Sequence, residues 1–190
     1  MQYDVWSVKV KSDDDFYVTA VSPSAAGALA LKATTPGING YGYKVSIKSS
    51  TNESGKNFTI VGTTVGGAAV TETIAGPNNT TVYTTNYFAK VTSVSTSASG
   101  GSIEVGYGGN LALPMTRIKG LYYVGSSGGA GSIIVTRNSN SLILLEIDTP
   151  GSATVNSLYM AAEGIRTTYS LDDFAVVAVT SVTSVTLICG

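Results

Sequence analysis

The chain has 190 residues, with 11 basic and 12 acidic side chains, no histidine and a net charge of −1. This length is enough for one large β domain or two small ones with a sizeable core. A chain without net positive charge offers no broad basic surface to phosphates, so a role in nucleic-acid binding is disfavoured. We also expect neither export nor membrane insertion, because no apolar run approaches the roughly 20 residues that cross a bilayer.

Charged residues make up only 12% of the chain, whereas 43% are hydrophobic and 22 are glycine. Surfaces with few charges tend to associate, so this composition predicts that much of the surface is covered in an assembly. The alternative, an extracellular β-sandwich with a Ser/Thr-coated surface, stays open. Cys189 is the single cysteine, and it therefore cannot form an internal disulfide or a multi-thiolate metal site.

Residues 1–42 predict two short strands followed by a connector. Alternating residues at 5–11 and 16–21 indicate the strands, with an acidic turn at 13–15 between them. Residues 25–32 have the composition of a short helix that the following Pro-Gly would end. We expect residues 1–42 to form N-terminal strands and an arm that reaches a neighbouring subunit.

Two series of strand-like runs follow, and we predict a β-sandwich domain from each, at residues 43–110 and 111–190. The first series reads YKVSIKS, NFTIVGTT, AAVTETIAG, TVYTTNYFAKVTSVST and GSIEVGYG. The second reads MTRIKGLYYVG, SIIVTRN, SLILLEIDT, TVNSLYMAA, IRTTYS and DFAVVAVTSVTSVTLICG. Turn signals about every 8 to 12 residues are typical of antiparallel sandwiches or barrels, so the expected fold class is all-β.

The two series also share short sequence echoes. SASGGSIEV at 97–105 is similar to SSGGAGSIIV at 126–135. Phe88-Ala89, followed by residues 92–94, is echoed by Phe174-Ala175, followed by residues 180–182. An internal duplication and a chance likeness between β-rich, Gly/Ser-rich hairpins both explain these matches, and both interpretations stay open.

Catalytic constellations are sparse in this sequence. The absence of histidine removes the usual general base, the Ser/His and Cys/His pairs and nearly all zinc sites. The Gly-rich stretch at 125–131 precedes a β-branched run and has no GK[ST], so it predicts a hairpin turn and no phosphate loop. The remaining carboxylates lack the spacing of a glycosidase pair; they are Asp13–Asp15, Asp172 with Asp173, Glu146, Asp148 and Glu163. We expect no enzyme, and neither a metal nor a cofactor.

Two weaker binding signals also have structural interpretations. Asp13–Asp15 suits calcium by charge, but it lacks the further ligands and the glycine of a calcium loop, which favours a solvated turn. The tyrosines suit a stacking platform, but core or interface positions are favoured, with Tyr83/Tyr87 and Tyr41/Tyr43 closest to platform spacing; the cluster is Tyr41, Tyr43, Tyr83, Tyr87, Tyr107, Tyr122 and Tyr123. The glycosylation-like sequences at Asn52, Asn57, Asn78 and Asn79 are assigned to turns and strand edges.

Residues 45–106 carry the motif series SxxNxSGxxFTIxGT, VTETIxGP, TxYFxxVTSV and GxxxVG. This segment resembles small virion proteins of tailed bacteriophages, and the ending VTSVTLICG is similar to the terminal part of such proteins. The resemblance implies consecutive antiparallel strands, with turns at residues 52–55, 66–67 and 76–78. It also implies a virion location and a structural role without catalysis.

Within that class we expect a capsid decoration protein that stabilises the head by bridging capsid subunits. A ring, tube or adaptor protein of the head-tail connector or tail is the nearest alternative, because both would assemble through strand edges. A carbohydrate-binding module is the alternative from another class. The expected partners are copies of the chain and the major capsid, connector or tail subunits, with no nucleic acid and no membrane.

Overall fold

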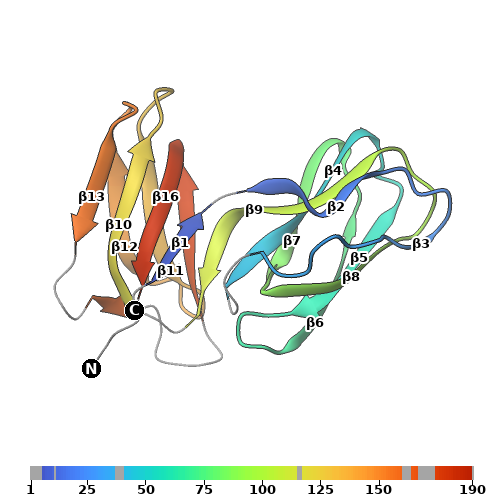
Figure 1. The fold of residues 1–190 in the computed structure, drawn as a ribbon, viewed down its shortest axis with the longest axis horizontal. Helices are drawn as coiled ribbons and strands as arrows, with labels where there is room; N and C mark the ends of the chain where they lie inside the picture. The colour runs from blue at the N-terminus through green and yellow to red at the C-terminus, as the bar shows by residue number, and fades with distance from the viewer. Residues whose placement is uncertain are drawn as a thin grey trace. The chain divides into compact units, whose positions relative to one another are not determined.

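The computed structural model of the chain describes residues 6–10, 12–36, 41–114, 117–159, 164–166 and 174–189. The regular elements in these residues are β-strands, and the strand pairs with an assigned register are antiparallel (Figure 1). The predicted all-β class is confirmed, as antiparallel sheets packed in sandwiches and not as a closed barrel. None of the described residues belongs to a helix that is long and apolar enough to cross a membrane.

The chain divides into two compact units. Unit 1 comprises Met1–Lys11 and Gly109–Gly190, and unit 2 comprises Ser12–Gly108. This differs from the expected division, because the described residues of the range 1–42 are shared between the two units and do not form an arm of their own. The boundary between the two series of strands falls within one long strand, close to the expected position at 110.

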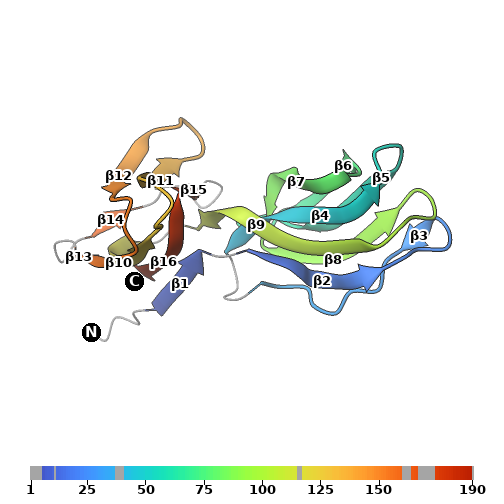
Figure 2. The same cartoon turned by 90° about the horizontal axis from the view of Figure 1, so that it is seen from above.

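Unit 2 is an eight-stranded sandwich. One sheet has the order β2-β9-β4-β7 and the other the order β3-β8-β5-β6 (Figure 2). Only β5 and β6 are neighbours in both the chain and a sheet, so the other connections cross between the sheets. Eight strands wound in this way form a jelly roll. The strands are β2 (Asp13–Val21), β3 (Gly27–Ala28), β4 (Gly42–Asn52), β5 (Asn57–Thr63), β6 (Ala69–Ala75), β7 (Asn78–Phe88), β8 (Lys90–Thr96) and the first half of β9 (Ile103–Leu113).

Unit 1 repeats the same connectivity. Its sheets have the orders β1-β16-β10-β13, with β14 also paired to β10, and β9-β15-β11-β12. If the two-residue strand β14 is left out and the other eight strands of each unit are lettered a to h in chain order, both units have sheets a-h-c-f and b-g-d-e. The strands are β1 (Trp6–Val10), the second half of β9, β10 (Arg117–Gly125), β11 (Gly131–Arg137), β12 (Ile143–Thr149), β13 (Val155–Tyr159), β14 (Ile165–Arg166), β15 (Ala175–Thr180) and β16 (Val182–Cys189).

The sequence echoes agree only in part with this repeated connectivity. Phe88-Ala89 precedes β8 and Phe174-Ala175 begins β15, and these two strands are equivalent. In contrast, residues 97–105 lead into β9 and residues 126–135 lead into β11, which are not equivalent strands. The shared strand order is what a duplication predicts, and it is a stronger argument for one than the short matches.

The core of unit 2 follows the alternation that the sequence predicts. In β5, Phe58 and Ile60 are fully buried, whereas Thr59 and Val61 are half-buried on the opposite face. A cluster of aromatic rings adds to this core, with ring centroids 4.6 Å apart for Tyr43 and Tyr107 and 6.3 Å apart for Tyr17 and Tyr107. Burial, assisted by the neighbouring Tyr107, raises the pKa values of Tyr17 and Tyr43, so both remain neutral core side chains.

The expected arm and helix within residues 12–36 are corrected. Strand β2 pairs with β9, and Tyr17 is fully buried. No helix forms at residues 25–32, because these residues form bends and the two-residue strand β3. The Leu29 amide donates to the Val94 carbonyl and the Lys32 amide to the Tyr17 carbonyl, both at 2.8 Å, so tertiary hydrogen bonds replace helical ones.

Several expected connections are also different. The run at 81–96 is two strands that break at Ala89, and the run at 174–189 breaks at Ser181, whose φ is 49°. The turn at 66–67 joins neighbouring strands as expected, with Gly67 at φ 85°. The turns at 52–55 and 76–78 and the Gly-rich stretch at 125–131 instead join strands of different sheets, because a jelly roll sends most of its connections across the sandwich.

Unit 2 is an insertion between β1 and the second half of β9, and its two ends lie together. Asp13 is in register with Tyr107, and a Cβ on Gly108 would lie 3.1 Å from the Ser12 side chain. Adjacent ends and a separate core are properties of a domain that folds alone. We predict that Ser12–Gly108 expressed alone unfolds in one cooperative transition, measured by circular dichroism during thermal denaturation. Molten, non-cooperative behaviour would show that unit 2 depends on the rest of the chain.

Candidate functional site

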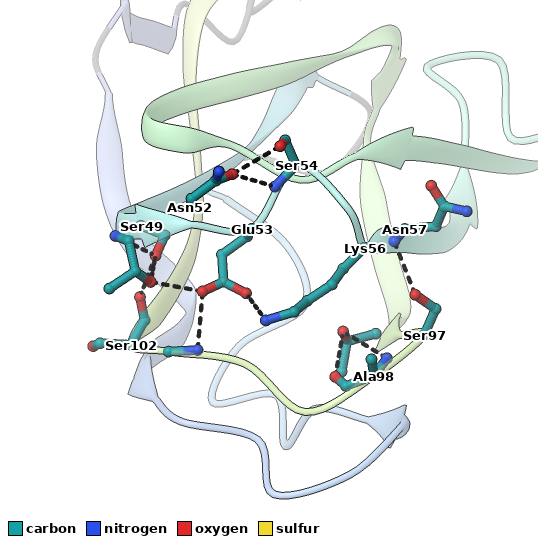
Figure 3. Close-up of polar contacts among 12 residues, drawn as sticks. Ser49, Asn52, Glu53, Ser54, Lys56, Asn57, Ser97, Ala98 and Ser102 are labelled. Carbon is teal, nitrogen blue, oxygen red and sulfur yellow. Dashed lines mark hydrogen bonds and ion pairs between the residues drawn. The ribbon is translucent and has the colours of Figure 1, made fainter.

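The most elaborate polar arrangement in unit 2 surrounds the buried carboxylate of Glu53, of which 2% is exposed (Figure 3). Its Oε1 accepts hydrogen bonds from the Thr51 hydroxyl at 2.6 Å and from the Gly101 amide at 3.0 Å. Its Oε2 accepts a hydrogen bond from Lys56 Nζ, with which it also forms an ion pair. Both carboxylate oxygens are therefore satisfied within the protein.

The local backbone holds Glu53 in place. Its amide donates to the Pro77 carbonyl at 2.7 Å, and its carbonyl accepts from the Lys56 amide at 2.9 Å. Glycines make room for the carboxylate on the other side, since a Cβ on Gly101 would lie 2.3 Å from the Thr51 hydroxyl and 3.0 Å from Glu53 Oε1. The cluster thus joins the β4–β5 turn to the β8–β9 connection at one end of the sandwich.

The electrostatics of this cluster favour a charged Glu53. Burial by itself would raise the pKa of this carboxyl, but the hydrogen bonds from Lys56, Thr51 and Gly101 outweigh it and hold the pKa below its ordinary value. A carboxylate that hydrogen bonds and an ion pair hold in its ionised form stabilises loops and is a poor acid or base near neutral pH. The hydrogen bonds of Glu53 therefore have a structural role, which is to hold the β4–β5 turn and the β8–β9 connection together.

The acidic run at 13–15 lies within β2, where two of its carboxylates meet lysines. Asp15 is 2.9 Å from Lys32 Nζ, and Asp14 is 2.8 Å from Lys48 Nζ. Glu104 also reaches Lys48, at 3.5 Å. The expected solvated turn is therefore a strand with exposed ion pairs, and no group of three potential metal ligands occurs in the part of the chain that the structure describes.

A shallow depression of about 150 Å³ lies beside Lys48, lined by Ser49, Ser50, Ser102 and Glu104. Its lining offers hydroxyls and a single carboxylate, which is too few acidic groups for the paired-carboxylate chemistry of a glycosidase. Elsewhere, Glu146 and Asp148 are both exposed on β12. The remaining carboxylates that the sequence singled out, Glu163 and Asp172 with Asp173, lie outside the described residues.

The tyrosines separate into core and surface positions. Tyr41, Tyr43, Tyr107 and Tyr123 are buried, which removes Tyr41/Tyr43 as a platform. On β7, Tyr83 is 47% exposed, and the ring of Tyr87 has Lys44 Nζ 5.5 Å from its centroid. In unit 2, these two rings, with a lysine beside one of them, are the part of the tyrosine cluster that still suits the stacking alternative.

Sheet edges are the other candidate interaction sites, and one of them is capped. Strand β7 lies at the edge of its sheet, and Glu72 of β6 in the opposite sheet reaches it. The Glu72 carboxylate accepts hydrogen bonds from the amides of Thr85 at 2.6 Å and Asn86 at 2.9 Å. An acidic side chain that occupies edge amides blocks the addition of another strand there. Glu72 shares the half-buried side of β6 with Val70 and Ile74, and its hydrogen bonds to the β7 amides account for a carboxylate at this position.

We predict that Glu72→Ala reduces the hydrogen-exchange protection of the Thr85 and Asn86 amides. It should also lower the free energy of unfolding of unit 2 by about 1 to 2 kcal/mol, because two donors lose their acceptor. Amide exchange followed by NMR measures the first effect, with Thr71→Ala, an exposed position on the same strand, as the control. Equal exchange in the two variants would refute the cap.

The glycosylation-like asparagines lie at strand ends, as expected. Asn52 ends β4, Asn57 begins β5, and Asn78 and Asn79 begin β7, with Asn79 at φ 51°.

Comparison of the chain with protein-family models, curated proteins and solved structures gives no match. The two jelly rolls and the chemistry of their surfaces are therefore the evidence for function.

Sequence reasoning did not identify Glu53 as important. Residues 52–55 were predicted only as a turn, and no role was predicted for Gly100-Gly101. The available signal was an acid and a lysine three residues apart on either side of Ser-Gly, which allows an ion pair across a tight turn. The Gly101 partner comes from 48 residues away and could not be inferred.

Proposed function

We propose that this chain is a non-enzymatic structural protein of a tailed-phage virion. The observation that carries the proposal is the pair of jelly rolls with the same strand order, built from a sequence with only 12% charged residues. Jelly rolls are a recurrent architecture of viral capsid proteins and of lectins. Low charge favours surfaces that are covered by neighbours.

The chemistry of the described surface supports binding over catalysis. The buried carboxylate of Glu53 is held by hydrogen bonds, and the carboxylates of Asp14, Asp15 and Glu104 are paired with lysines. Sandwiches whose loops are held by hydrogen bonds and ion pairs are suited to transmitting mechanical load between subunits. The proposed role is therefore to add contact area between neighbouring subunits of the particle.

The favoured position is the outside of the head, as a decoration protein that bridges capsid subunits. A ring or tube protein of the connector or tail is the alternative, since the same sandwich surfaces would serve cyclic assembly. The number of copies separates the two positions. A decoration protein approaches the copy number of the shell subunit, whereas a ring protein is present at the few copies that its symmetry allows.

The test is quantitative mass spectrometry of particles purified on a density gradient from lysates of the source that encodes the chain. We expect its peptides to follow the particle band and to keep a fixed ratio to the shell subunit after a high-salt wash. Peptides that remain in the soluble fractions would contradict virion membership. A copy number far below that of the shell subunit would assign the chain to the connector or tail.

A carbohydrate-binding module remains the second candidate, because Tyr83 is exposed and Lys44 lies beside the ring of Tyr87. Glycan-array binding that is lost in Tyr83→Ala would favour it. The matched control is Tyr122→Ala, since Tyr122 is 41% exposed but belongs to unit 1. No binding on the array would leave the structural role as the proposal.

A further inference from the structure

The outer side of one sheet of unit 2 carries rows of polar and aromatic side chains. Strand β4 lies between β7 and β9 in this sheet. Val45 and Ile47 of β4 are fully buried, so the residues that alternate with them have outward positions. Each of these outward residues has a partner on β7; the pairs are Lys44 with Tyr87, Ser46 with Tyr83 and Lys48 with Thr81.

An irregularity in the pairing of β4 with β7 brings two tyrosines into neighbouring rows. Tyr83 and Tyr87 are four residues apart in the chain, but their partners on β4 are only two residues apart. Residues two apart on a strand lie on the same side of the sheet, at a distance of about 7 Å. Tyr83 and Tyr87 therefore belong to adjacent rows of one side, which is closer than their spacing in the sequence indicates.

The ring of Tyr83 lies across the sheet. A Cβ placed on Gly108 of β9 would lie 3.4 Å from Cε1 of Tyr83 and 3.6 Å from its hydroxyl oxygen. Because β4 separates β7 from β9, the ring extends over β4 to reach this position. Ser46, the partner of Tyr83 on β4, is fully buried in spite of its outward position, which is consistent with a ring above it. One face of the ring thus packs on the sheet, and Tyr83 is still 47% exposed.

Depressions with a polar lining lie beside this ring. One of them has a volume of about 290 Å³ and is lined by Lys48, Ser49, Ser50, Asn79, Thr80 and Thr81. It shares three of these residues with the depression beside Glu104. Thr81 is two residues from Tyr83 on the same strand, so the polar lining begins about 7 Å from the ring. Hydroxyl and amide side chains both donate and accept hydrogen bonds.

The charged groups on this side balance one another. Lys48 forms ion pairs with Asp14 at 2.8 Å and with Glu104 at 3.5 Å. Lys44 places its Nζ 5.5 Å from the centroid of the Tyr87 ring. Two lysines and two carboxylates sum to no net charge, so this group of side chains does not attract the phosphates of a nucleic acid or the carboxylates of an acidic glycan.

We propose that this side of unit 2 binds a neutral oligosaccharide. A pyranose ring has a face of C–H groups, which packs on an aromatic ring, and hydroxyls around its edge, which need hydrogen-bond donors and acceptors. Tyr83 supplies the aromatic surface, and the lining of the two depressions supplies the polar groups. The rows from Lys44 to Lys48 extend over about 14 Å, which is long enough for a short chain of sugars.

This inference gives the carbohydrate-binding candidate a site and a class of ligand, and it rests on that candidate and not on virion membership. The two proposals can therefore fail separately. A chain that is found in particles but binds no glycan would contradict the sugar site alone. A chain that binds a neutral glycan but is absent from particles would contradict the virion role alone.

The experiment is a screen of the full chain on an array of neutral, sialylated and uronic-acid glycans, followed by calorimetric titration of the strongest neutral ligand. Tyr83→Ala is expected to weaken binding at least about tenfold, because the aromatic platform is lost. Thr81→Val should weaken it about threefold, because one hydrogen-bonding group is lost. The matched controls are Tyr122→Ala, an exposed tyrosine of unit 1, and Thr71→Val, an exposed threonine of the opposite sheet, and both should bind as wild type. Circular dichroism verifies that each variant is folded.

Three outcomes would overturn the proposal. The first is a wild-type protein that binds no neutral glycan on the array. The second is neutral-glycan binding that folded Tyr83→Ala and Thr81→Val leave intact, or that the two controls weaken equally. The third is a preference for the acidic glycans, or for an oligothymidylate titrated in parallel, which would assign the exposed ring to an anionic ligand.

Discussion

Glu53→Gln is expected to lower the free energy of unfolding of unit 2 by roughly 3 kcal/mol. The substitution keeps the shape of the side chain but removes the charge that Lys56 pairs with and weakens the hydrogen bonds from Thr51 and Gly101. Because Glu53 is only 2% exposed, water cannot replace these partners without opening the loop. The β4–β5 turn and the β8–β9 connection should loosen together.

The lowered pKa of the Glu53 carboxyl also predicts that the stability of unit 2 depends on pH. The pKa of Glu53 is depressed in the folded protein, so its contribution to stability is complete above the pKa of an unfolded glutamate, about 4.3. It is lost as the pH falls from there through the folded pKa. Unit 2 should therefore lose stability in acid, and Glu53→Gln should lose less over the same range because this carboxyl is gone.

Chemical denaturation followed by two probes measures these effects. The only tryptophan, Trp6, belongs to strand β1 of unit 1, so its fluorescence reports on that unit. Circular dichroism reports on both units. Glu104→Gln is the matched control, since Glu104 pairs with a solvent-exposed lysine, Lys48, at 3.5 Å, and such a pair contributes little to stability. Equal destabilisation by the two variants would contradict a special role for Glu53.

Gly106→Val is expected to disrupt the pairing of β2 with β9 and to destabilise unit 2 by several kcal/mol, on the order of 3 to 5. A Cβ at this position would lie 1.8 Å from the Asp13 carbonyl oxygen and 2.4 Å from the Asp14 carbonyl carbon. Both are backbone atoms, so no side-chain rotation relieves the clash. Displacing β2 would also expose Tyr17, which is fully buried.

Gly55→Ala is the control for this substitution, because a Cβ there meets no atom within 4 Å. It should change the unfolding free energy by less than about 1 kcal/mol. Thermal denaturation by circular dichroism compares both variants with wild type. A Gly106→Val variant as stable as wild type would mean that β2 does not lie against β9 in this register.

Much of the secondary structure could be predicted from the sequence, because alternation is a local property. The predicted runs at 57–64 and 68–76 correspond closely to β5 and β6, with Gly66-Gly67 between them. The sheet order could not be predicted in the same way. Phe58 faces the core whether its neighbour is β6 or β4, so the pattern that locates a strand does not identify its partners.

Local sequence patterns also do not predict the insertion of unit 2 or the long-range polar contacts. The pairing of β1 with β16 joins residues at opposite ends of the chain, and no spacing signals it. Asp14 meets Lys48 across 34 residues, which converts an expected turn into an ion-paired strand. Where the determining contact is local, as for Glu53 with Lys56, a signal was present and was overlooked.

The proposed role of this molecule is adhesion between β surfaces within a particle. Its most direct test is the temperature at which purified particles release their DNA, followed with a DNA-binding dye in particles with and without the chain. We predict that particles lacking the chain release DNA at a lower temperature and that adding the purified wild-type protein restores the higher value. An unchanged release temperature after both removal and addition would contradict the claim.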